Sequence, residues 1–182
     1  MNRLVVMTVG KTHSGKTTFA KELESILQHA VVIDQDNHAE FINEHYKKLR
    51  PNEGPNTLKF TITNAIVDYA VAHSDFHLIL SNSNLNKQGR SNHLKFFHDR
   101  GFVSIIVYFE LPLELLKERV ETTQRSKTIF RSASSFMEVL ERQEMLNPEK
   151  PSKEEANYLF VIHNPDDAAE IMQQIKEISQ NS

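Results

Sequence analysis

The sequence predicts an α/β protein with a mostly parallel central sheet. The first observation is that short apolar runs, rich in β-branched residues, alternate along the chain with stretches of helical spacing. Such alternation is typical of a parallel sheet covered by helices. The second observation is a glycine-rich motif at residues 10–17, which lies between a strand pattern and a helix pattern. The length, 182 residues, suits a single domain with a sizeable core, which we expect to span 1–182.

Five apolar runs predict the strands. The first run, residues 3–9, leads directly into the glycine-rich motif. The fourth, residues 102–109, is apolar nearly throughout, which suits a central parallel strand covered on both faces. In chain order, the expected strands are 3–9, 30–33, 76–80, 102–109 and 158–162.

Seven further stretches have helical spacing. Gly101 is expected to end one helix, and Pro112 lies near the start of the next, where its missing N–H costs nothing. Residues 50–56, with two prolines and a glycine, predict the clearest loop. In chain order, the expected helices are about 16–28, 36–48, 58–72, 87–100, 112–122, 135–146 and 164–178.

The glycine-rich motif is Gly10-Lys11-Thr12-His13-Ser14-Gly15-Lys16-Thr17, which follows the pattern G-x-x-x-x-G-K-[ST] of a phosphate-binding loop. In such a loop the lysine supplies charge for the β- and γ-phosphates, and the threonine supplies a hydroxyl for Mg²⁺. The alternative, a chance match, is disfavoured because the motif uses two of only five glycines. We expect the side chain of His13 to point outward. Nucleotide contacts are expected at Gly10, His13, Ser14, Gly15, Lys16, Thr17 and Thr18.

Polar residues follow the second and third strands, at the sheet edge where α/β proteins bind ligands. Asp36 is expected to orient a substrate hydroxyl or accept its proton, and Asp34 to hold a metal together with Thr17, although which of the two is the key carboxylate stays open. The alternative is that one of the two carboxylates only caps the next helix. The third strand ends in Ser81, where many phosphate-loop enzymes carry a metal-linked Asp, so a second metal partner stays open. Further along, Asn82 and Asn84 could bind substrate or shape the turn.

A cationic cluster begins in the helix after the fourth strand and continues beyond it. It consists of Arg119, Arg125, Lys127 and Arg131, around a short polar loop. Mobile cations suit a closing lid, which we expect at about 123–134. Arg119 and Arg125 are the expected catalytic cations, and Arg125 is also expected to contact the nucleotide. The alternative is a solvated basic face.

Composition bounds the possible partners and location. The net charge of −3 gives no bulk electrostatic case for a nucleic-acid or membrane partner. The absence of Cys excludes disulfides and thiolate metal sites. No apolar run approaches the roughly 18 residues of a membrane span, and the N-terminus lacks the shape of a signal peptide, so we expect a cytoplasmic location. The nine histidines lack metal-ligand spacing and are expected to be solvated or capping residues.

Several weaker patterns accompany the motif: residues 78–85, Gly89-Arg90, residues 115–120 leading to Arg125, and residues 151–155. Together they resemble the small P-loop kinases, AAA-type ATP-binding proteins of the polynucleotide-kinase-like and zeta-toxin-like group. The resemblance implies a three-layer α/β/α P-loop NTPase fold, with a five-stranded parallel sheet in the order 2-3-1-4-5. It also implies a short arginine-bearing lid and an adenine site near Asn164-Pro165.

Two departures from that family bear on the substrate. Asp36 matches the family's substrate-activating carboxylate, but the Arg that often follows it is missing, because Asn37, His38 and Ala39 stand there. This argues against a phosphorylated or polynucleotide substrate. The other departure is Ser81, which replaces the Asp that often ends the third strand.

The sequence therefore predicts an enzyme that uses ATP and Mg²⁺ to phosphorylate a small hydroxyl-bearing acceptor, whose identity stays open. Nucleic acid and membrane are not expected partners, and we expect a monomer or a homodimer. One alternative is a kinase of nucleic-acid ends. The other is a nucleotide-dependent switch with slow hydrolysis, which the missing Asp at Ser81 would favour and the lack of a guanine-specificity motif would not.

Overall fold

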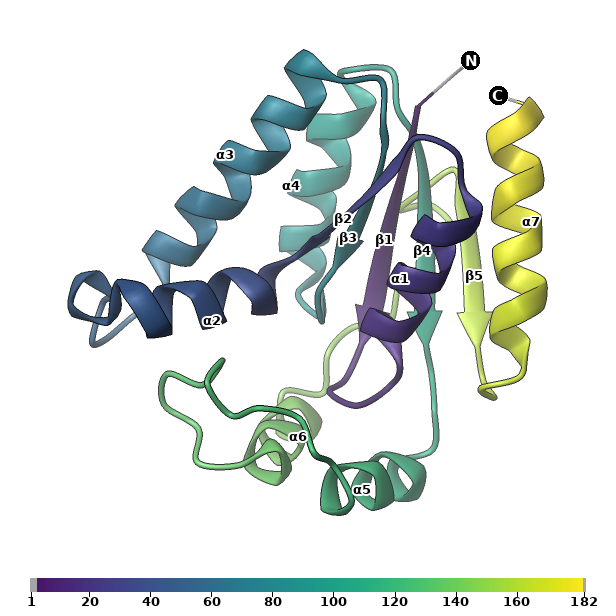
Figure 1. Ribbon diagram of the computed structural model, residues 1–182. Helices are drawn as coiled ribbons and strands as arrows, with labels where there is room; N and C mark the ends of the chain where they lie inside the picture. The colour runs from purple at the N-terminus through teal and green to yellow at the C-terminus, as the bar shows by residue number, and fades with distance from the viewer. Residues whose placement is uncertain (1–2, 182) are drawn as a thin grey trace.

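Residues 3–181, the part of the chain that this computed structural model describes, form a parallel sheet between two layers of helices (Figure 1). The strands lie in the order β2-β3-β1-β4-β5, and neighbouring strands are parallel. Both the number of strands and their order are as predicted. The ends of the predicted domain, Met1 and Ser182, lie outside the described residues. The strands are β1 (Leu4–Gly10), β2 (Ala30–Asp34), β3 (His77–Ser81), β4 (Val103–Phe109) and β5 (Tyr158–Ile162).

Each predicted helix is present. One of them differs from its predicted form: residues 36–48 were expected to form a single helix, but they divide into α2 and a short 3₁₀ helix, η1. Among residues 3–181, no helix combines the length and hydrophobicity needed to cross a membrane. The helices are α1 (Lys16–Ile26), α2 (Gln35–His45), η1 (Lys47–Leu49), α3 (Thr57–His73), α4 (Lys87–His98), α5 (Leu113–Glu121), α6 (Phe136–Met145) and α7 (Asp167–Asn181).

The core consists of two apolar layers, one on each face of the sheet. On one face, Phe19 and Leu23 of α1 and Ile175 of α7 pack against the sheet. On the other face, Leu94 and Phe97 of α4 do so. Strand β1 is buried along its whole length, which explains why its sequence is apolar without alternation. The sheet is thus packed on both faces, and its carboxyl ends carry the loops that build the site.

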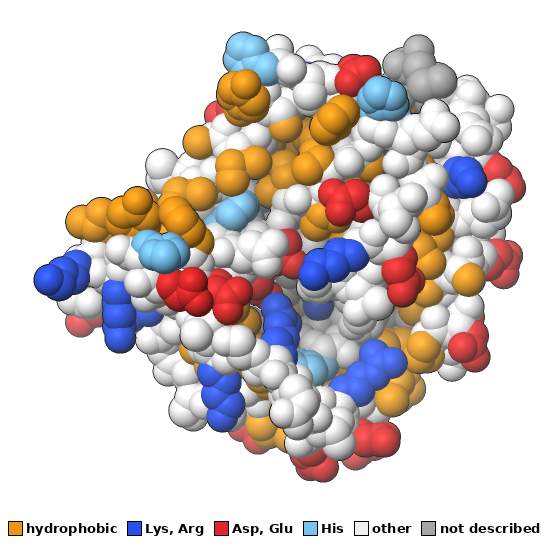
Figure 2. Space-filling model, in the orientation of Figure 1, with side chains coloured by type: hydrophobic (Ala, Val, Ile, Leu, Met, Phe, Trp, Pro, Cys, Tyr) orange, Lys and Arg blue, Asp and Glu red, His pale blue; other side chains and the backbone are white. Residues whose placement is uncertain are grey.

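Helix α3 is much less buried than the other long helices. Thr63 is its one buried residue among those described. Ile66 and Tyr69 lie on the apolar stripe that predicts the helix, yet they are 40% and 69% exposed. Figure 2 shows hydrophobic side chains gathered on this side of the molecule. The periodicity therefore predicts the helix correctly, but it does not show which side of the helix packs against the rest of the protein.

A buried ion pair ties together two loops at the carboxyl end of the sheet. Arg90 of α4 is 1% exposed and donates from Nε and Nη2 to the carboxylate of Glu155, at 2.8 and 3.0 Å. The same guanidinium donates to the carbonyl groups of Asn84 and Leu85, after β3, and of Glu149, before β5. Arg90 and Glu155 belong to two of the weak sequence patterns noted above, so these two patterns are in contact. Their role here is to hold the two loops together.

Two turns have the geometry that their residues predict. Gly101 has φ 78°, and its N–H and that of the next residue donate back to the last turn of α4, which ends the helix as expected. Asn84 has φ 46°, and its side-chain amide donates to the carbonyl of Thr8 at 2.8 Å. Of the two roles left open for Asn84, the structure supports turn shaping.

The expectation that all nine histidines are solvated or capping is wrong for His77. This residue is 7% exposed at the start of β3, and its Nδ1 accepts a hydrogen bond from the N–H of Leu4 at 2.9 Å. Local sequence does not reveal this role, because the partner lies 73 positions away.

Candidate functional site

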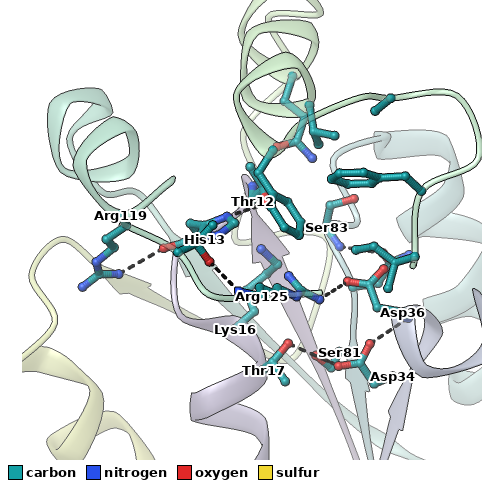
Figure 3. Close-up of a pocket in the computed structure, with 18 of the residues that line it drawn as sticks. Thr12, His13, Lys16, Thr17, Asp34, Asp36, Ser81, Ser83, Arg119 and Arg125 are labelled. Carbon is teal, nitrogen blue, oxygen red and sulfur yellow. Dashed lines mark hydrogen bonds and ion pairs between the residues drawn. The ribbon is translucent and has the colours of Figure 1, made fainter. Parts of the chain in front are cut away.

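The loop after β1 and the carboxyl ends of β2 and β3 face a cavity of about 650 Å³ (Figure 3). The segment from Arg119 to Gln143 closes its other side. We call it the cationic cavity, because five Lys and Arg residues of the described chain line it: Lys16, Arg119, Arg125, Arg131 and Arg142. Most of the residues that the sequence predicts for the site meet here, namely His13, Gly15, Lys16, Thr17, Thr18, Asp34, Asp36, Arg119 and Arg125.

Gly10 and Ser14 are not among the residues that line the cavity, but they shape its loop. A Cβ atom at Gly10 would lie 2.9 Å from the Cβ atom of Phe109, so a side chain does not fit there. Ser14 is buried, and its hydroxyl donates to the carbonyl of Lys11 at 2.8 Å. Their direct contact with a nucleotide stays a prediction.

The N-terminus of α1 opens onto the cavity. Its N-cap, Gly15, has φ 97°, a left-handed conformation that glycine adopts without strain. The amides of Lys16, Thr17 and Thr18 have no hydrogen-bond partner within residues 3–181, as is usual in the first turn of a helix. Free N–H groups and the positive end of the helix dipole together favour an anion at this point.

Lys16 lies under the loop, and its ammonium group donates to the carbonyl of Lys11 and to the hydroxyl of Ser14. Burial lowers the pKa of Lys16 to about 8, while the nearby Asp36 carboxylate acts in the opposite direction. The ammonium is therefore still charged at pH 7. It is a weakly solvated cation beside open amides, which suits the binding of a phosphate chain.

Asp34 performs the capping role that the sequence left open, and a second role as well. Its Oδ1 accepts the N–H of Asp36 at 2.8 Å, which caps α2. Its Oδ2 accepts the hydroxyls of Thr17 and Ser81, at 3.2 and 3.3 Å. Asp34 and Ser81 are paired across β2 and β3, which explains their contact. One carboxylate and two hydroxyls, all oxygen donors, thus meet beside the loop.

Asp36 forms an ion pair across the cavity. Its Oδ2 accepts from Nη2 of Arg125 at 2.6 Å, and both side chains are about one third exposed, at 39% and 35%. Arg125 comes from the segment between α5 and α6, far along the chain, and its guanidinium also lies over the ring of Phe136. The structure therefore brings together the predicted catalytic carboxylate and one predicted catalytic cation.

The other members of the predicted cationic cluster differ in their placement. Nη1 of Arg119 donates to the carbonyl of His13 at 3.1 Å, which puts this guanidinium at the phosphate-binding loop. Arg131 lines the cavity, but it donates to the carbonyls of Pro51 and Gly54, in the loop before α3. Lys127 is not among the lining residues.

The expectation that the His13 side chain points outward is wrong. Its ring packs edge-on against Phe136 of α6, with 4.6 Å between ring centroids, and its Nδ1 is 2.9 Å from the hydroxyl of Thr12. Burial, together with the charges of Arg125, Lys16 and Arg119, lowers its pKa to about 4, so the ring is neutral at pH 7. Its Nε2 is buried without a hydrogen-bond partner among the described residues.

Sequence reasoning missed the contribution of α6. The side chain of Gln143 accepts the N–H of Thr12 at 2.7 Å, and Lys11 forms an ion pair with Glu144. Both contacts join the phosphate-binding loop to residues more than 130 positions away. The spacing of α6 predicts a helix, but nothing in its sequence indicates that it covers this loop.

The donors present fit a nucleotide and a divalent cation. The open amides at the start of α1 and the ammonium of Lys16 offer hydrogen bonds to anionic acceptors. The oxygens of Thr17 and Asp34 suit Mg²⁺, which takes oxygen ligands and needs few from the protein when phosphates supply the rest. No cluster of three or more His, Cys, Asp or Glu suited to a metal occurs within residues 3–181.

Comparison with known proteins identifies the fold and the family. Residues 5–146 match the family model of the AAA domain. A search of curated protein sequences gave no match. Kti12 of Chaetomium thermophilum, solved with ADP-AlF3, is 16% identical, with a TM-score of 0.65 over 95% of this chain and 97% of that one.

Two metabolic kinases share the fold as well. The APS kinase CysC of Mycobacterium tuberculosis, solved with AMPPNP and APS, is 16% identical, with a TM-score of 0.60 over 98% of each chain. The shikimate kinase of Acinetobacter baumannii, solved with shikimate, is 19% identical, with a TM-score of 0.52 over 98% of this chain and 94% of that one. At such identities the likeness establishes a common fold.

Proposed function

Because the chain belongs to the AAA domain family, we propose that it is a phosphotransferase that moves the γ-phosphate of ATP to a small hydroxyl-bearing acceptor. The observation that carries this proposal is convergence on one cavity. The phosphate-binding loop, two carboxylates at the junction of β2 and α2, Arg119 of α5 and Arg125 beyond that helix all line it. A nucleotide-binding module without transfer chemistry would not require a carboxylate opposite the loop.

The first task in phosphoryl transfer is to hold the phosphates and neutralise their charge. The amides of residues 16–18 and the ammonium of Lys16 would bind the phosphate chain. Bound Mg²⁺ would supply further charge neutralisation, and Thr17 and Asp34 would hold it. Arg119 and Arg125 would stabilise the charge that spreads over the transferring group. The adenine site near Asn164-Pro165 stays a prediction.

The second task is to orient the acceptor. Asp36 is partly exposed on the cavity wall, so its carboxylate can reach a hydroxyl group that enters from solvent. It would orient this hydroxyl and accept its proton. In the present structure Arg125 donates a hydrogen bond to the carboxylate of Asp36. An anionic phosphate chain would compete for Arg125 and leave Asp36 free for the acceptor.

Residues 123–134 would act as the lid. This segment contacts the opposite wall, since Asn43 and Glu40 of α2 are hydrogen-bonded to Thr128. Arg131 adds the contacts to the loop before α3 that are described above. Closure of such a segment would exclude water from the transferring phosphoryl group.

The test is Asp36→Asn, compared with Asp75→Asn as a matched control. Asp75 is exposed just before β3, at the opposite end of the sheet from the cavity. In Asp36→Asn, acceptor-dependent formation of ADP should fall about 10²–10⁴-fold, while the affinity for ATP measured by calorimetry should stay within a few-fold. The control should match the wild type. Unchanged turnover in Asp36→Asn would instead favour a switch with slow hydrolysis, which the Ser81 departure supports.

A further inference from the structure

A second cavity, of about 340 Å³, lies beside the first, between α3 and α4. Both helices lie on the same side of the sheet (Figure 1). Each presents residues one turn apart, Thr63, Asn64, Val67 and Asp68 from α3 and Asn92, His93, Phe96 and Phe97 from α4. The ends of β2 and β3 supply Ile33 and Leu80. The volume is within the range of ligand pockets, about 300–1,000 Å³.

The chemistry of this cavity differs from that of the first. No Lys or Arg occurs among its lining residues within the described chain, and its one carboxylate is Asp68. Desolvation lowers the pKa of His93, so this imidazole is neutral at pH 7. We call it the neutral cavity. An anionic group would have no cation to pair with here and would meet Asp68, so phosphorylated and carboxylated ligands are disfavoured.

The walls combine aromatic rings with amide groups. Phe96 and Phe97 contribute rings on the α4 side. Asn64 on α3 and Asn92 on α4 each carry a hydrogen-bond donor and an acceptor on one planar group. Such amides pair well with the edge of a nucleobase, and apolar walls suit its faces. The combination favours a flat, uncharged, polar ring over an aliphatic or ionic ligand.

The two cavities meet at one hydrogen-bonded pair. Asn82 lines both of them, and its side-chain amide donates to Oε1 of Gln35 at 2.9 Å. Gln35 is 6% exposed and lies in the chain between Asp34 and Asp36. A molecule that extends from the neutral cavity past this pair would enter the cationic cavity, where Asp36 lies.

We propose that the neutral cavity binds the body of the phosphoryl acceptor, and that the acceptor is an uncharged nucleoside. This inference rests on the proposed function. The base would lie between α3 and α4, and a sugar hydroxyl would reach Asp36 past the pair of Gln35 and Asn82. In the transfer step the hydroxyl oxygen forms a bond to the γ-phosphorus, and the bond from that phosphorus to the β,γ-bridging oxygen breaks. ADP leaves, and the hydroxyl proton passes to Asp36 and then to water.

The experiment uses adenosine, thymidine, cytidine and guanosine, each paired with its 5′-monophosphate. ADP formation from ATP and Mg²⁺ is measured with every compound, and phosphorus NMR identifies the product. At least one nucleoside should be phosphorylated, and its 5′-monophosphate should be a poor substrate, because its 5′-hydroxyl is already esterified and its phosphate would place a dianion beside the carboxylate of Asp36. Phosphorylation of the monophosphates alone, or of no nucleoside, overturns the proposal.

Two variants test the location. Val67→Phe would fill the neutral cavity, whereas Ala65→Phe on the exposed side of α3 is the matched control. Val67→Phe should lower kcat/KM for the nucleoside about tenfold or more, with unchanged affinity for ATP, and the control should match the wild type. Asn64→Leu, at an exposed position, serves as a second variant without the risk of overpacking. Asn64→Leu should likewise lower kcat/KM for the nucleoside, and equal kcat/KM in the wild type, Val67→Phe and Asn64→Leu overturns the proposal.

The outcomes separate this inference from the proposed function. If a nucleoside binds, as measured by calorimetry, and Val67→Phe weakens its binding, but no phosphate is transferred, the proposed function fails and the cavity assignment survives. If the protein phosphorylates an anionic acceptor, and the rate is the same in Val67→Phe as in the wild type, the proposed function survives and the present inference fails.

Discussion

The cationic and neutral cavities share a wall, yet they differ in almost every chemical respect. The first gathers Lys16, Arg119 and Arg125 around two carboxylates. The second is lined, within the described chain, by five amide side chains, two phenylalanines and no Lys or Arg. Asn82 belongs to both. Positive charge is thus confined to the side where phosphate is expected to bind.

The difference arises over three consecutive residues at the junction of β2 and α2. Asp34 and Asp36 line the cationic cavity, whereas Gln35 between them lines the neutral one. Where a strand passes into a helix, successive side chains leave the backbone in different directions. One residue step therefore separates the charged site from the uncharged one. The difference teaches that the nucleotide and the acceptor can be recognised by separate chemistry and changed by separate mutations.

The largest expected effect is on the cationic side. Arg125→Ala should lower kcat about 10³-fold, because an arginine that stabilises the transferring phosphoryl group contributes on this order. Acceptor binding in the neutral cavity should change little. Steady-state rates of ADP formation at saturating acceptor provide the measurement. Lys127→Ala, in the same segment but outside the cavity lining, is the control. A normal kcat in Arg125→Ala would show that Arg125 does not stabilise the transferring phosphoryl group.

The next effect concerns the support of the neutral cavity. Arg90→Met leaves the carboxylate of Glu155 buried without its partner, so the free energy of unfolding should fall by about 3–5 kcal/mol. Urea denaturation measures this change. The double variant Arg90→Met with Glu155→Leu should recover a large part of it, because no charge is then left unpaired. If the single variant is as stable as the wild type, Arg90 does not hold the loops at this end of the sheet.

A smaller effect is the pH dependence of nucleotide binding. Lys16 has a pKa of about 8 in the folded protein, lowered by burial. Since the charged form binds phosphate, the affinity for ATP should fall as the pH rises above about 8, by at most about tenfold per pH unit. Nucleoside binding should not follow this profile. Calorimetry at a series of pH values measures both, and a flat profile for ATP would contradict the assigned role of Lys16.

Lys16 also links pH to stability. Its pKa is about 8 in the folded state, against the ordinary value of 10.5. Between these values the unfolded chain binds more protons than the folded one, so this residue makes the free energy of unfolding rise with pH in that window. In Lys16→Met this contribution should be absent. Thermal unfolding of both proteins across the window checks the sign.

The smallest effect is that of salt. Exposed charge pairs are screened over about 10 Å at 0.1 M ionic strength. Raising the salt concentration should therefore weaken ATP binding severalfold and leave nucleoside binding almost unchanged. Titrations of both ligands at low and high salt make the comparison. Equal salt dependence would mean that the second cavity is not neutral in practice.

Much of the fold was accessible from the sequence because its signals are local. The strand before Gly10, the helix after Gly15 and the termination at Gly101 each depend on residues within a few positions. The order of the strands came from the resemblance and not from any spacing. The carboxylates at the end of β2 could be assigned to the ligand-binding edge because parallel strands all end there.

The unpredicted features depend on residues far apart in the chain. The contact of His13 with Phe136 and the bond from Thr12 to Gln143 require that α6 lies over the loop. The neutral cavity requires that α3 and α4 stand apart, which no helical periodicity reveals. In α3 the apolar stripe even suggests burial where Tyr69 is exposed. Such placements are set by the packing of whole elements.

The central claim is that the loop at residues 10–17 holds the phosphates of ATP through Lys16, and calorimetric titration with Mg²⁺ and ATP tests it most directly. The wild type should bind, and so should Lys21→Ala, a control at an exposed position on the same helix. Lys16→Ala should lose most of the affinity. If Lys16→Ala binds ATP as tightly as the wild type, the assignment of the cationic cavity is wrong, and the proposed transfer chemistry falls with it.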